Sequence, residues 1–254
     1  MKKLIIFLMI VGVAFGATLL SGSPRANANV SIQAGDLIRG ETFSAVYYYG
    51  ADGFRYVFPN TKTYYTWYDN FDSVKFVSDA QLGQLQIGGN VTYRPGVKMI
   101  KINTDPRTYA VDANGTLRHV GSEAVAIALY GSSWNQQIHD VPDAFFTNYT
   151  IGDQIADAAT FNKSAITATA GSINSDKGLI APAELSITDS AYVPVSVNIS
   201  KGQTVRFTNN GTESHTVTSD DLTWGSGTMM PGRSFVRKFD ETGTYTFFDS
   251  YNSQ

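Results

Sequence analysis

His215 is the residue whose type and surroundings offer the most chemistry. Asp220 and Asp221 follow it within six residues, and Asp249 lies in the next segment of the chain. An imidazole grouped with carboxylates could form a weak, oxygen-rich metal site. The other interpretation is an ordinary loop histidine that holds no ligand. The elements around His215 must decide which groups can reach it.

The residues on either side of His215 carry a resemblance to a known family. From Leu185 the chain reads LSITDSAYVPVSVNISKGQTVRFTNNGTESHTVTSDD and, further on, SGTMMPGRSFVRKFDETGTYTFFDSYNSQ. Over about residues 184–254 this pattern resembles the cupredoxins, the plastocyanin-like copper proteins. The resemblance implies a Greek-key β-sandwich in which His215 occupies the position of the first histidine ligand. It also implies that Asp249 replaces the cysteine ligand and Asn252 the second histidine.

The resemblance therefore implies a copper scaffold without most of its ligands. A blue-copper centre needs a cysteine thiolate and two imidazoles in a trigonal set. The sequence has no cysteine, and its other histidines, His119 and His139, lie far upstream. We expect the copper site to be lost and no cofactor to be bound. The alternative is copper binding or electron transfer through a modified site around His215.

Alternating apolar residues predict the strands of this sandwich at about 193–199, 204–208, 216–218, 234–239 and 244–248. Close strands with regular turns indicate an antiparallel arrangement. In the cupredoxins a last apolar strand follows the ligand loop, and losing three large buried side chains would cost roughly 4–9 kcal/mol, at about 1.5–3 kcal/mol each. We therefore expect the sequence to be a fragment. The alternatives are a partner chain that supplies a strand at the open edge, or a sandwich that tolerates the gap.

The N-terminal half, residues 29–155, contains a duplicated unit. Residues 34–53 align with 96–115, and residues 78–89 align with 142–153. Such a repeat predicts two β-rich units with short helices that bury their apolar faces together. This half also resembles an uncharacterised repeat of bacterial secreted and surface proteins, which implies no established chemistry.

Local signals inside the units predict turns and one helix. Gly-containing turns at 50–53 and 112–115 indicate two hairpins. Ser122 is a candidate N-cap for a helix through Tyr130, with Gly131 as its end. Residues 156–183 are rich in Ala, Thr, Ser and Gly, which predicts a flexible linker. The modules on its two sides would then have no need to touch.

Aromatic stretches in the first unit suggest a second kind of site. Tyr48, Tyr65 and Trp67 lie in the runs YYY and TYYTWY, and flat aromatic faces can stack on sugar rings. The other interpretation is that these residues form the core of a small β-module, with their polar ends at its rim. A glycan or another cell-surface polymer is thus a candidate ligand.

The N-terminus predicts export. Lys2 and Lys3 precede an apolar run at 4–20, and Ala26-Asn27-Ala28 matches a small-residue cleavage site. We expect residues 1–28 to be a signal peptide, with an uncleaved anchor as the alternative and the only expected contact with a membrane. Either case places the folded part outside the cytoplasm, as a secreted, periplasmic or cell-surface protein.

Composition limits the remaining functions. The formal net charge is −3, so the chain lacks the basic surplus typical of nucleic-acid binding. No G-x-S-x-G motif marks a nucleophile, and nothing singles out a catalytic pair among the 22 acidic residues. We therefore expect no enzymatic activity. The sequence favours a non-catalytic envelope or extracellular protein with a binding, adhesive or structural role.

Overall fold

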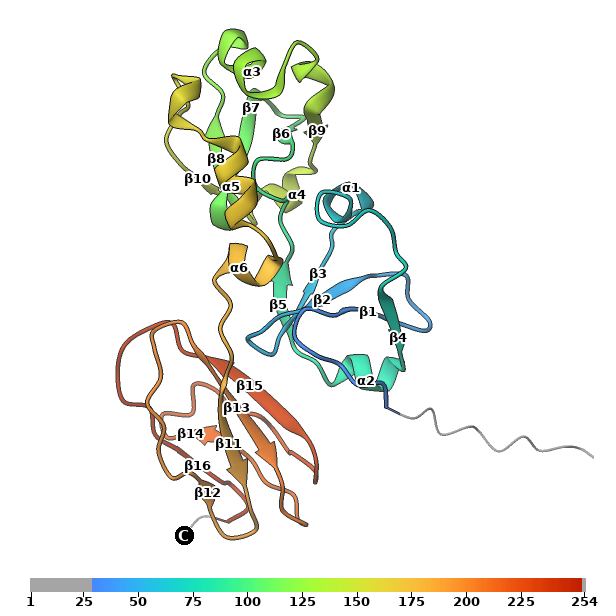
Figure 1. The fold of residues 1–254 in the computed structure, drawn as a ribbon. Helices are drawn as coiled ribbons and strands as arrows, with labels where there is room; N and C mark the ends of the chain where they lie inside the picture. The colour runs from blue at the N-terminus through green and yellow to red at the C-terminus, as the bar shows by residue number, and fades with distance from the viewer. Residues whose placement is uncertain (1–28, 253–254) are drawn as a thin grey trace, which may run out of the picture.

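The computed structural model describes residues 29–252 and arranges them in three β-rich bodies (Figure 1). We call residues 29–94 the first unit, 95–155 the second unit and 183–252 the C-terminal domain. The expected signal peptide, residues 1–28, lies outside the described residues. Within 29–252, no helix combines the length and apolar character needed to cross a membrane. The mainly β fold is the one that the sequence predicts.

A five-stranded sheet with the strand order β4-β1-β2-β3-β5 forms the first unit. The central pairs are antiparallel, whereas the edge strands β4 and β5 run parallel to their neighbours. Tyr48, Tyr56 and Tyr64 fill the core between the sheet and its helices. The elements are β1 (Leu37–Gly40), β2 (Tyr47–Tyr49), β3 (Arg55–Val57), α1 (Thr61–Tyr64), β4 (Val74–Val77), α2 (Asp79–Gly83) and β5 (Ile87–Asn90).

The second unit has the same pattern of strand pairing. Its order is β10-β8-β7-β6-β9, again antiparallel at the centre and parallel at both edges. The elements are β6 (Met99–Ile102), β7 (Asp105–Asp112), η1 (Ala113–Gly115), β8 (Thr116–His119), α3 (Glu123–Tyr130), η2 (Trp134–Gln137), β9 (Ile138–Asp140), α4 (Asp143–Phe146) and β10 (Thr150–Ile151). The resemblance of this half to a repeat of bacterial surface proteins stays a prediction.

The predicted turns and helix are present. Gly53 and Gly115 end the two hairpin turns with φ values of 89° and 65°, a region that glycine enters without a steric penalty. The Ser122 side chain accepts a hydrogen bond from the Val125 amide at the start of α3. Gly131 follows the last residue of that helix with φ 81°.

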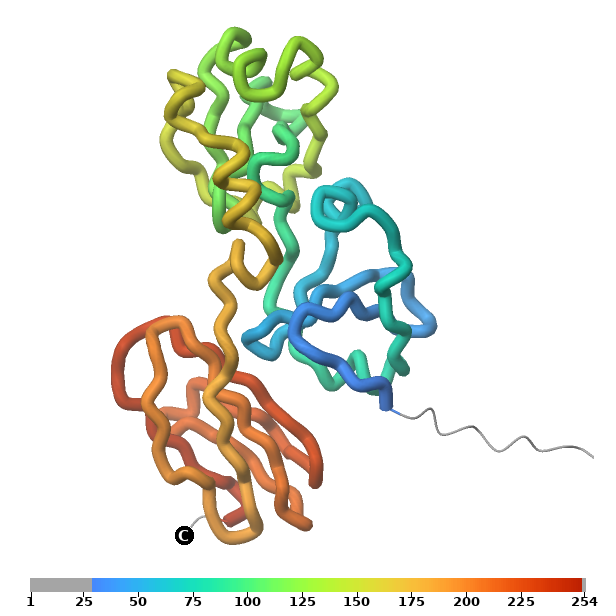
Figure 2. The backbone as a smooth tube through the Cα atoms, in the orientation of Figure 1, coloured from blue at the N-terminus to red at the C-terminus, as the bar shows by residue number. Residues whose placement is uncertain are grey.

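Residues 156–183 do not form the flexible linker that their composition predicts. They fold into η3 (Ala158–Thr160), α5 (Lys163–Thr169) and α6 (Ile173–Lys177), the gold segment that runs along the second unit in Figure 2 and then down toward the other bodies. Phe161 is buried in the core of the second unit, and Ile173 is buried in the core of the first. These apolar anchors and side-chain caps from Asn162 and Ser172 order the segment. We call residues 157–179 the strap, because it joins the two units.

The C-terminal domain is a β-sandwich. One sheet has the order β12-β11-β13-β15, and β14 pairs with β16 in the other. Phe207, Val217 and Phe239 lie in the core between them. The strands are β11 (Ala183–Ile187), β12 (Tyr192–Val193), β13 (Thr204–Asn209), β14 (Thr218–Ser219), β15 (Ser234–Lys238) and β16 (Phe247–Phe248).

Two features of this sandwich differ from the sequence-based expectation. β11 and β13 pair in parallel, although an antiparallel arrangement was expected. The strands expected at 193–199 and 244–248 form regular pairs only at Tyr192–Val193 and Phe247–Phe248. The remaining residues of both segments have no strand beside them in the described structure, which explains why the ladders are short.

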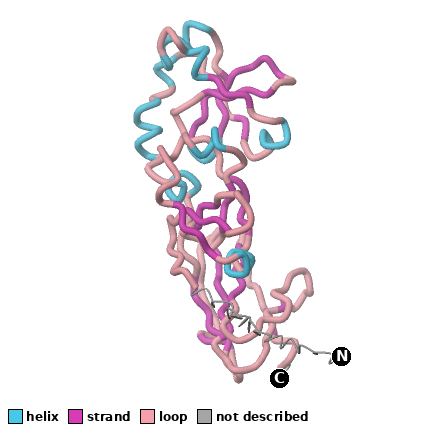
Figure 3. The backbone as a smooth tube through the Cα atoms, turned by 90° about the vertical axis from the view of Figure 1, so that its right-hand side faces the viewer, coloured by secondary structure: helices cyan, strands magenta, loops and turns pink. Residues whose placement is uncertain are grey.

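The C-terminal domain also touches the first unit, contrary to the expectation that the modules need not meet. The Thr204 hydroxyl donates to the Asp52 carbonyl at 2.9 Å, and Arg206 donates to the Tyr49 hydroxyl at 3.0 Å. The Gln86 side chain bonds both backbone polar groups of Val236. The three bodies form an elongated molecule (Figure 3).

Candidate functional site

His215 sits in the loop between β13 and β14 and is only 2% exposed. The backbone of His215 exchanges two hydrogen bonds with the backbone of Met229, which fixes the loop against a neighbouring segment. Buried Asn209 supports the same loop, because its amide group donates to the carbonyls of Glu213 and Met229. The imidazole is therefore held in one place by the backbone around it.

Both ring nitrogens of His215 bond to carboxylates. Nδ1 lies 2.6 Å from Oδ2 of Asp249, and Nε2 lies 3.1 Å from Oδ1 of Asp189. We call these three residues the ion triad. It ties together the loops that follow β11, β13 and β16.

Each carboxylate of the ion triad is held by further donors. Asp249 accepts from the backbone amides of Thr216 and Tyr251. Asp189 accepts from the amides of Thr212 and Glu213. Since the carboxylates are fixed by several donors, they form a rigid acceptor pair on the two sides of the imidazole.

The electrostatics of the triad favour its charged form. Burial by itself lowers the pKa of His215, but the hydrogen bonds that its ring donates to Asp249 and Asp189 outweigh it and leave the pKa raised. Burial acts to raise the pKa of Asp249, yet the bonds from His215 and from backbone amides leave it lowered. The Glu213 amide and His215 lower the pKa of Asp189. The shifts of all three pKa values thus favour an imidazolium between two carboxylates.

These residues do not fit a copper ion. The chain has no cysteine, and the carboxylate oxygens of Asp249 already accept hydrogen bonds from His215 and from backbone amides. Neither ring nitrogen of His215 is free to coordinate. Within residues 29–252, no group of three or more His, Cys, Asp or Glu side chains is arranged to hold a metal ion.

The other expected members of a metal site lie elsewhere. Asp221 accepts hydrogen bonds from Thr223 in an exposed turn, and Asp220 is engaged through its amide with the Thr246 carbonyl. Asn252 lies beside the triad, where its amide group approaches the Asp189 carbonyl at 3.4 Å. His119 and His139 belong to β8 and β9 of the second unit.

Asp189 is the member of the triad that the sequence did not indicate. It follows β11, and Ile187 pairs with Asn209 in the parallel ladder of β11 and β13. Parallel strands end at the same edge of a sheet, so the loop with Asp189 lies beside the loop with His215. A prediction of parallel pairing would have found it, whereas the expected antiparallel arrangement concealed it.

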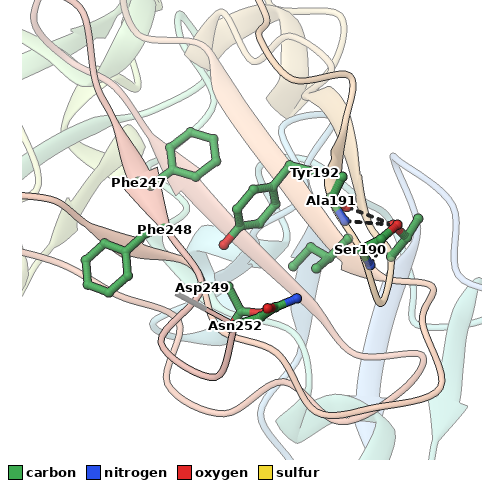
Figure 4. A pocket seen from close by; sticks show the side chains of 9 residues that line it. Ser190, Ala191, Tyr192, Phe247, Phe248, Asp249 and Asn252 are labelled. Atoms are coloured by element: carbon green, nitrogen blue, oxygen red, sulfur yellow. Dashed lines mark hydrogen bonds between the residues drawn. The ribbon is translucent and has the colours of Figure 1, made fainter. Parts of the chain in front are cut away.

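A pocket of about 290 Å³ opens beside the triad (Figure 4). Tyr192 and Phe247 form one side of it, and Asp249 and Asn252 lie at its end. The Tyr192 hydroxyl donates to the Thr216 carbonyl at 2.7 Å. Asp249 and Tyr192 are thus already hydrogen-bonded within the protein, whereas Thr188, Ser190 and Asn252 also line the pocket.

The aromatic residues expected to stack on glycans do not share one surface. Tyr48 is 2% exposed and belongs to the core of the first unit. Trp67 is partly buried, donates to the Thr92 carbonyl and packs one face near Arg94. Tyr65 is 54% exposed, so it alone of the three presents much of its ring to solvent.

Comparison with known proteins supports the resemblance at this end of the chain. Residues 160–254 match the family model of the cupredoxin-like domain, a stretch that begins inside the strap and includes the ion triad. Neither the curated proteins nor the solved structures gave a match to this chain. The sandwich fold and the matched residues agree, and the C-terminal part of the chain is a cupredoxin-like domain.

Proposed function

We propose that this chain is an exported, non-catalytic protein of the cell envelope or extracellular space, with a binding, adhesive or structural role. In this proposal the cupredoxin-like domain works without copper. The observation that carries it is the engagement of both His215 ring nitrogens by carboxylates at 2.6 and 3.1 Å. A histidine bonded on both sides is neither a free metal ligand nor a free general base.

The ion triad gives the domain a structural link between its loops. Asp249 lies after β16 and Asp189 lies after β11, so two charge-assisted hydrogen bonds hold both loops to His215. Such bonds are roughly twice as strong as neutral ones. The residues that could have served redox chemistry here serve stability instead.

Export and the absence of catalysis are supported by the sequence. The basic, apolar and small-residue segments of residues 1–28 have the order of an export signal. The only histidine of the cupredoxin-like domain has both ring nitrogens hydrogen-bonded in the triad, and no sequence motif marks a nucleophile. A domain that presents surfaces rather than a reactive centre suits a binding or structural role.

Titration with Cu(II), followed by calorimetry and electron paramagnetic resonance, tests this proposal. We expect no stoichiometric uptake by the protein. The double variant Asp249→Cys, Asn252→His serves as the positive control, because it frees one ring nitrogen and adds a thiolate and an imidazole. Tight 1:1 binding that disappears in His215→Gln would overturn the proposal and support a copper protein with a modified site.

A further inference from the structure

An apolar groove crosses the C-terminal domain between residues 195–199 and residues 243–247. Its volume is about 450 Å³, and Val205, Phe207 and Phe239 lie within its lining. No charged side chain lines it. Tyr192 and Phe247 also line the pocket of Figure 4, so the groove continues toward the ion triad.

The two walls of the groove belong to segments that are not paired as strands over most of their length. Within the described part of the chain, residues 194–199 and 241–245 take part in no backbone–backbone hydrogen bond. Residues 196–199 have the alternation of a strand, because Val197 and Ile199 are partly buried while Ser196 and Asn198 are exposed; residues 241–245 are all exposed. Within the described chain, residues 195–199 and 243–245 therefore offer unpaired backbone donors and acceptors, as the edge of a sheet does.

The apolar side chains at this place are unusually exposed. Val195 is 85% exposed, Val193 is 52% exposed and Tyr245 is 42% exposed. The described chain supplies no strand to cover them, since its own alternating N-terminal residues Val30 and Ile32 pack on the first unit. A guest that covered them would gain about 25 cal/mol for each Å² of apolar surface removed from water.

The backbone groups of the walls and the apolar side chains between them, such as Val205, Phe207 and Phe239, together determine which kind of ligand fits. The backbone groups of an unpaired segment can be satisfied in register by one extended peptide, but not by a helix, a sugar or a lipid chain. The uncharged lining requires the inward side chains to be apolar, and these occur at every second position of a strand. At about 3.3 Å per residue, walls of five residues match a guest of about five to seven residues.

We propose that this groove binds an extended segment of another protein chain as an added β-strand. The segment is uncharged on its inward face and carries apolar side chains at alternate positions. Main-chain hydrogen bonds give such an interaction its affinity, and the side chains give it specificity. The inference deepens the proposed binding role, and its test is independent of copper.

The test uses the purified protein and a fluorescein-labelled synthetic peptide, Lys-Thr-Val-Thr-Val-Thr-Val-Lys. We expect saturable binding by fluorescence anisotropy and at least tenfold slower amide hydrogen exchange in residues 195–199 and 243–245. A peptide with proline in place of the central valine lacks one backbone donor and should bind at least tenfold more weakly.

Two variants of the protein distinguish peptide binding in the groove from nonspecific binding. Val195→Asp adds a charge at an 85% exposed position, so the fold should persist while peptide binding falls at least tenfold. Met230→Asp adds the same charge to an apolar residue that is 64% exposed in the same domain and does not line the groove, and it should change binding less than twofold. Equal weakening by both variants would contradict the proposal.

Other occupants of the groove give distinct results. Slow exchange of both walls in the protein alone would show that the groove is filled without the peptide, and would overturn the proposal. Sedimentation showing self-association that Val195→Asp abolishes would assign the groove to a second copy instead. Absence of peptide binding with fast exchange of both walls would also refute the proposal, and would leave the copper experiment unaffected.

Discussion

At the scale of single residues, Asp249 decides the chemistry of the cupredoxin-like domain. A carboxylate at this position provides no thiolate, and it also occupies Nδ1 of His215 at 2.6 Å. Asp189 occupies the second ring nitrogen. The side chain of His215 is only 3% exposed to solvent, whereas the side chain of Asp189 is 41% exposed. We therefore expect Asp249 to contribute more to stability than Asp189, because water screens the latter.

The triad predicts a distinctive dependence of stability on pH. The raised pKa of His215 adds stability that is complete below the unfolded value of 6.5 and is lost as the pH rises through the folded pKa. The lowered pKa values of Asp249 and Asp189 add stability that is complete above the unfolded value of 3.8 and is lost on acidification. The C-terminal domain should thus be most stable between pH 3.8 and 6.5.

Calorimetry of thermal unfolding at about pH 5.5, 7 and 8.5 checks this expectation. The melting temperature of the C-terminal domain should fall with rising pH, and His215→Gln should remove most of that fall. Stability that increases steadily from pH 5.5 to 8.5 in the unmodified protein would show that the imidazole is held neutral.

Asp249→Asn tests the larger of the two contacts. The substitution keeps the shape of the side chain but removes its charge, and a hydrogen bond to a charged group is worth about 1.5–3 kcal/mol. We expect the free energy of unfolding to fall by that amount in urea denaturation. Asp221→Asn, which changes an exposed turn carboxylate away from His215, is the matched control and should change it by less than about 0.5 kcal/mol. Equal losses in the two variants would contradict the role of the triad.

At the scale of elements, the sequence predicted patterns that repeat locally and missed those set by distant partners. Ser122 and Gly131 mark the ends of α3 because a cap acts within one helical turn. The hairpin turns at Gly53 and Gly115 are equally local. By contrast, the parallel pairing of β11 with β13 depends on contacts between residues far apart in the sequence, which local patterns do not reveal. The position of Asp189 beside His215 depends on the same pairing.

The strap was missed for a related reason. Its composition is that of a linker, but Phe161 and Ile173 are spaced so that each enters a different core. Two buried side chains outweigh the bias of the residues between them, because burying each is worth about 1.5–3 kcal/mol. The average composition of the strap does not reveal two apolar residues that are buried in different cores.

Ile173→Ala tests whether the strap stabilises the first unit. Ile173 is fully buried among Tyr48, Tyr64 and their neighbours, and removing such a side chain costs about 2–5 kcal/mol. Ile180→Ala is the matched control, since Ile180 is 46% exposed just beyond the strap. Urea denaturation should show the loss in the first variant and little change in the second. Unchanged stability of Ile173→Ala would mean that the strap packs without supporting the unit.

At the scale of the whole molecule, the strap and the interface beside β13 set the positions of three bodies. Arg206 bonds to Glu184 in its own domain and to the Tyr49 hydroxyl in the first unit. Gly53 permits this approach, because a Cβ atom there would lie 2.6 Å from an Arg206 nitrogen. None of the residues that bond across this interface lines the groove proposed to bind a peptide.

This interface predicts that the protein moves largely as one elongated body. Gln86 makes two hydrogen bonds to Val236, and Arg206 makes one to Tyr49. The Thr204 hydroxyl adds a bond to the Asp52 carbonyl. At about 0.5–1.5 kcal/mol each, these four bonds are enough to favour one arrangement but not to make it permanent. In the double variant Gln86→Ala, Arg206→Ala the C-terminal domain should swing on residues 180–182. Small-angle X-ray scattering should then show a larger radius of gyration and a broader distance distribution, while circular dichroism stays the same.

Lys201→Ala, which breaks an exposed ion pair within the C-terminal domain, should leave the scattering unchanged. If the double variant scatters like the unmodified protein, the strap alone must fix the domain, and the interface contacts are only incidental to its placement.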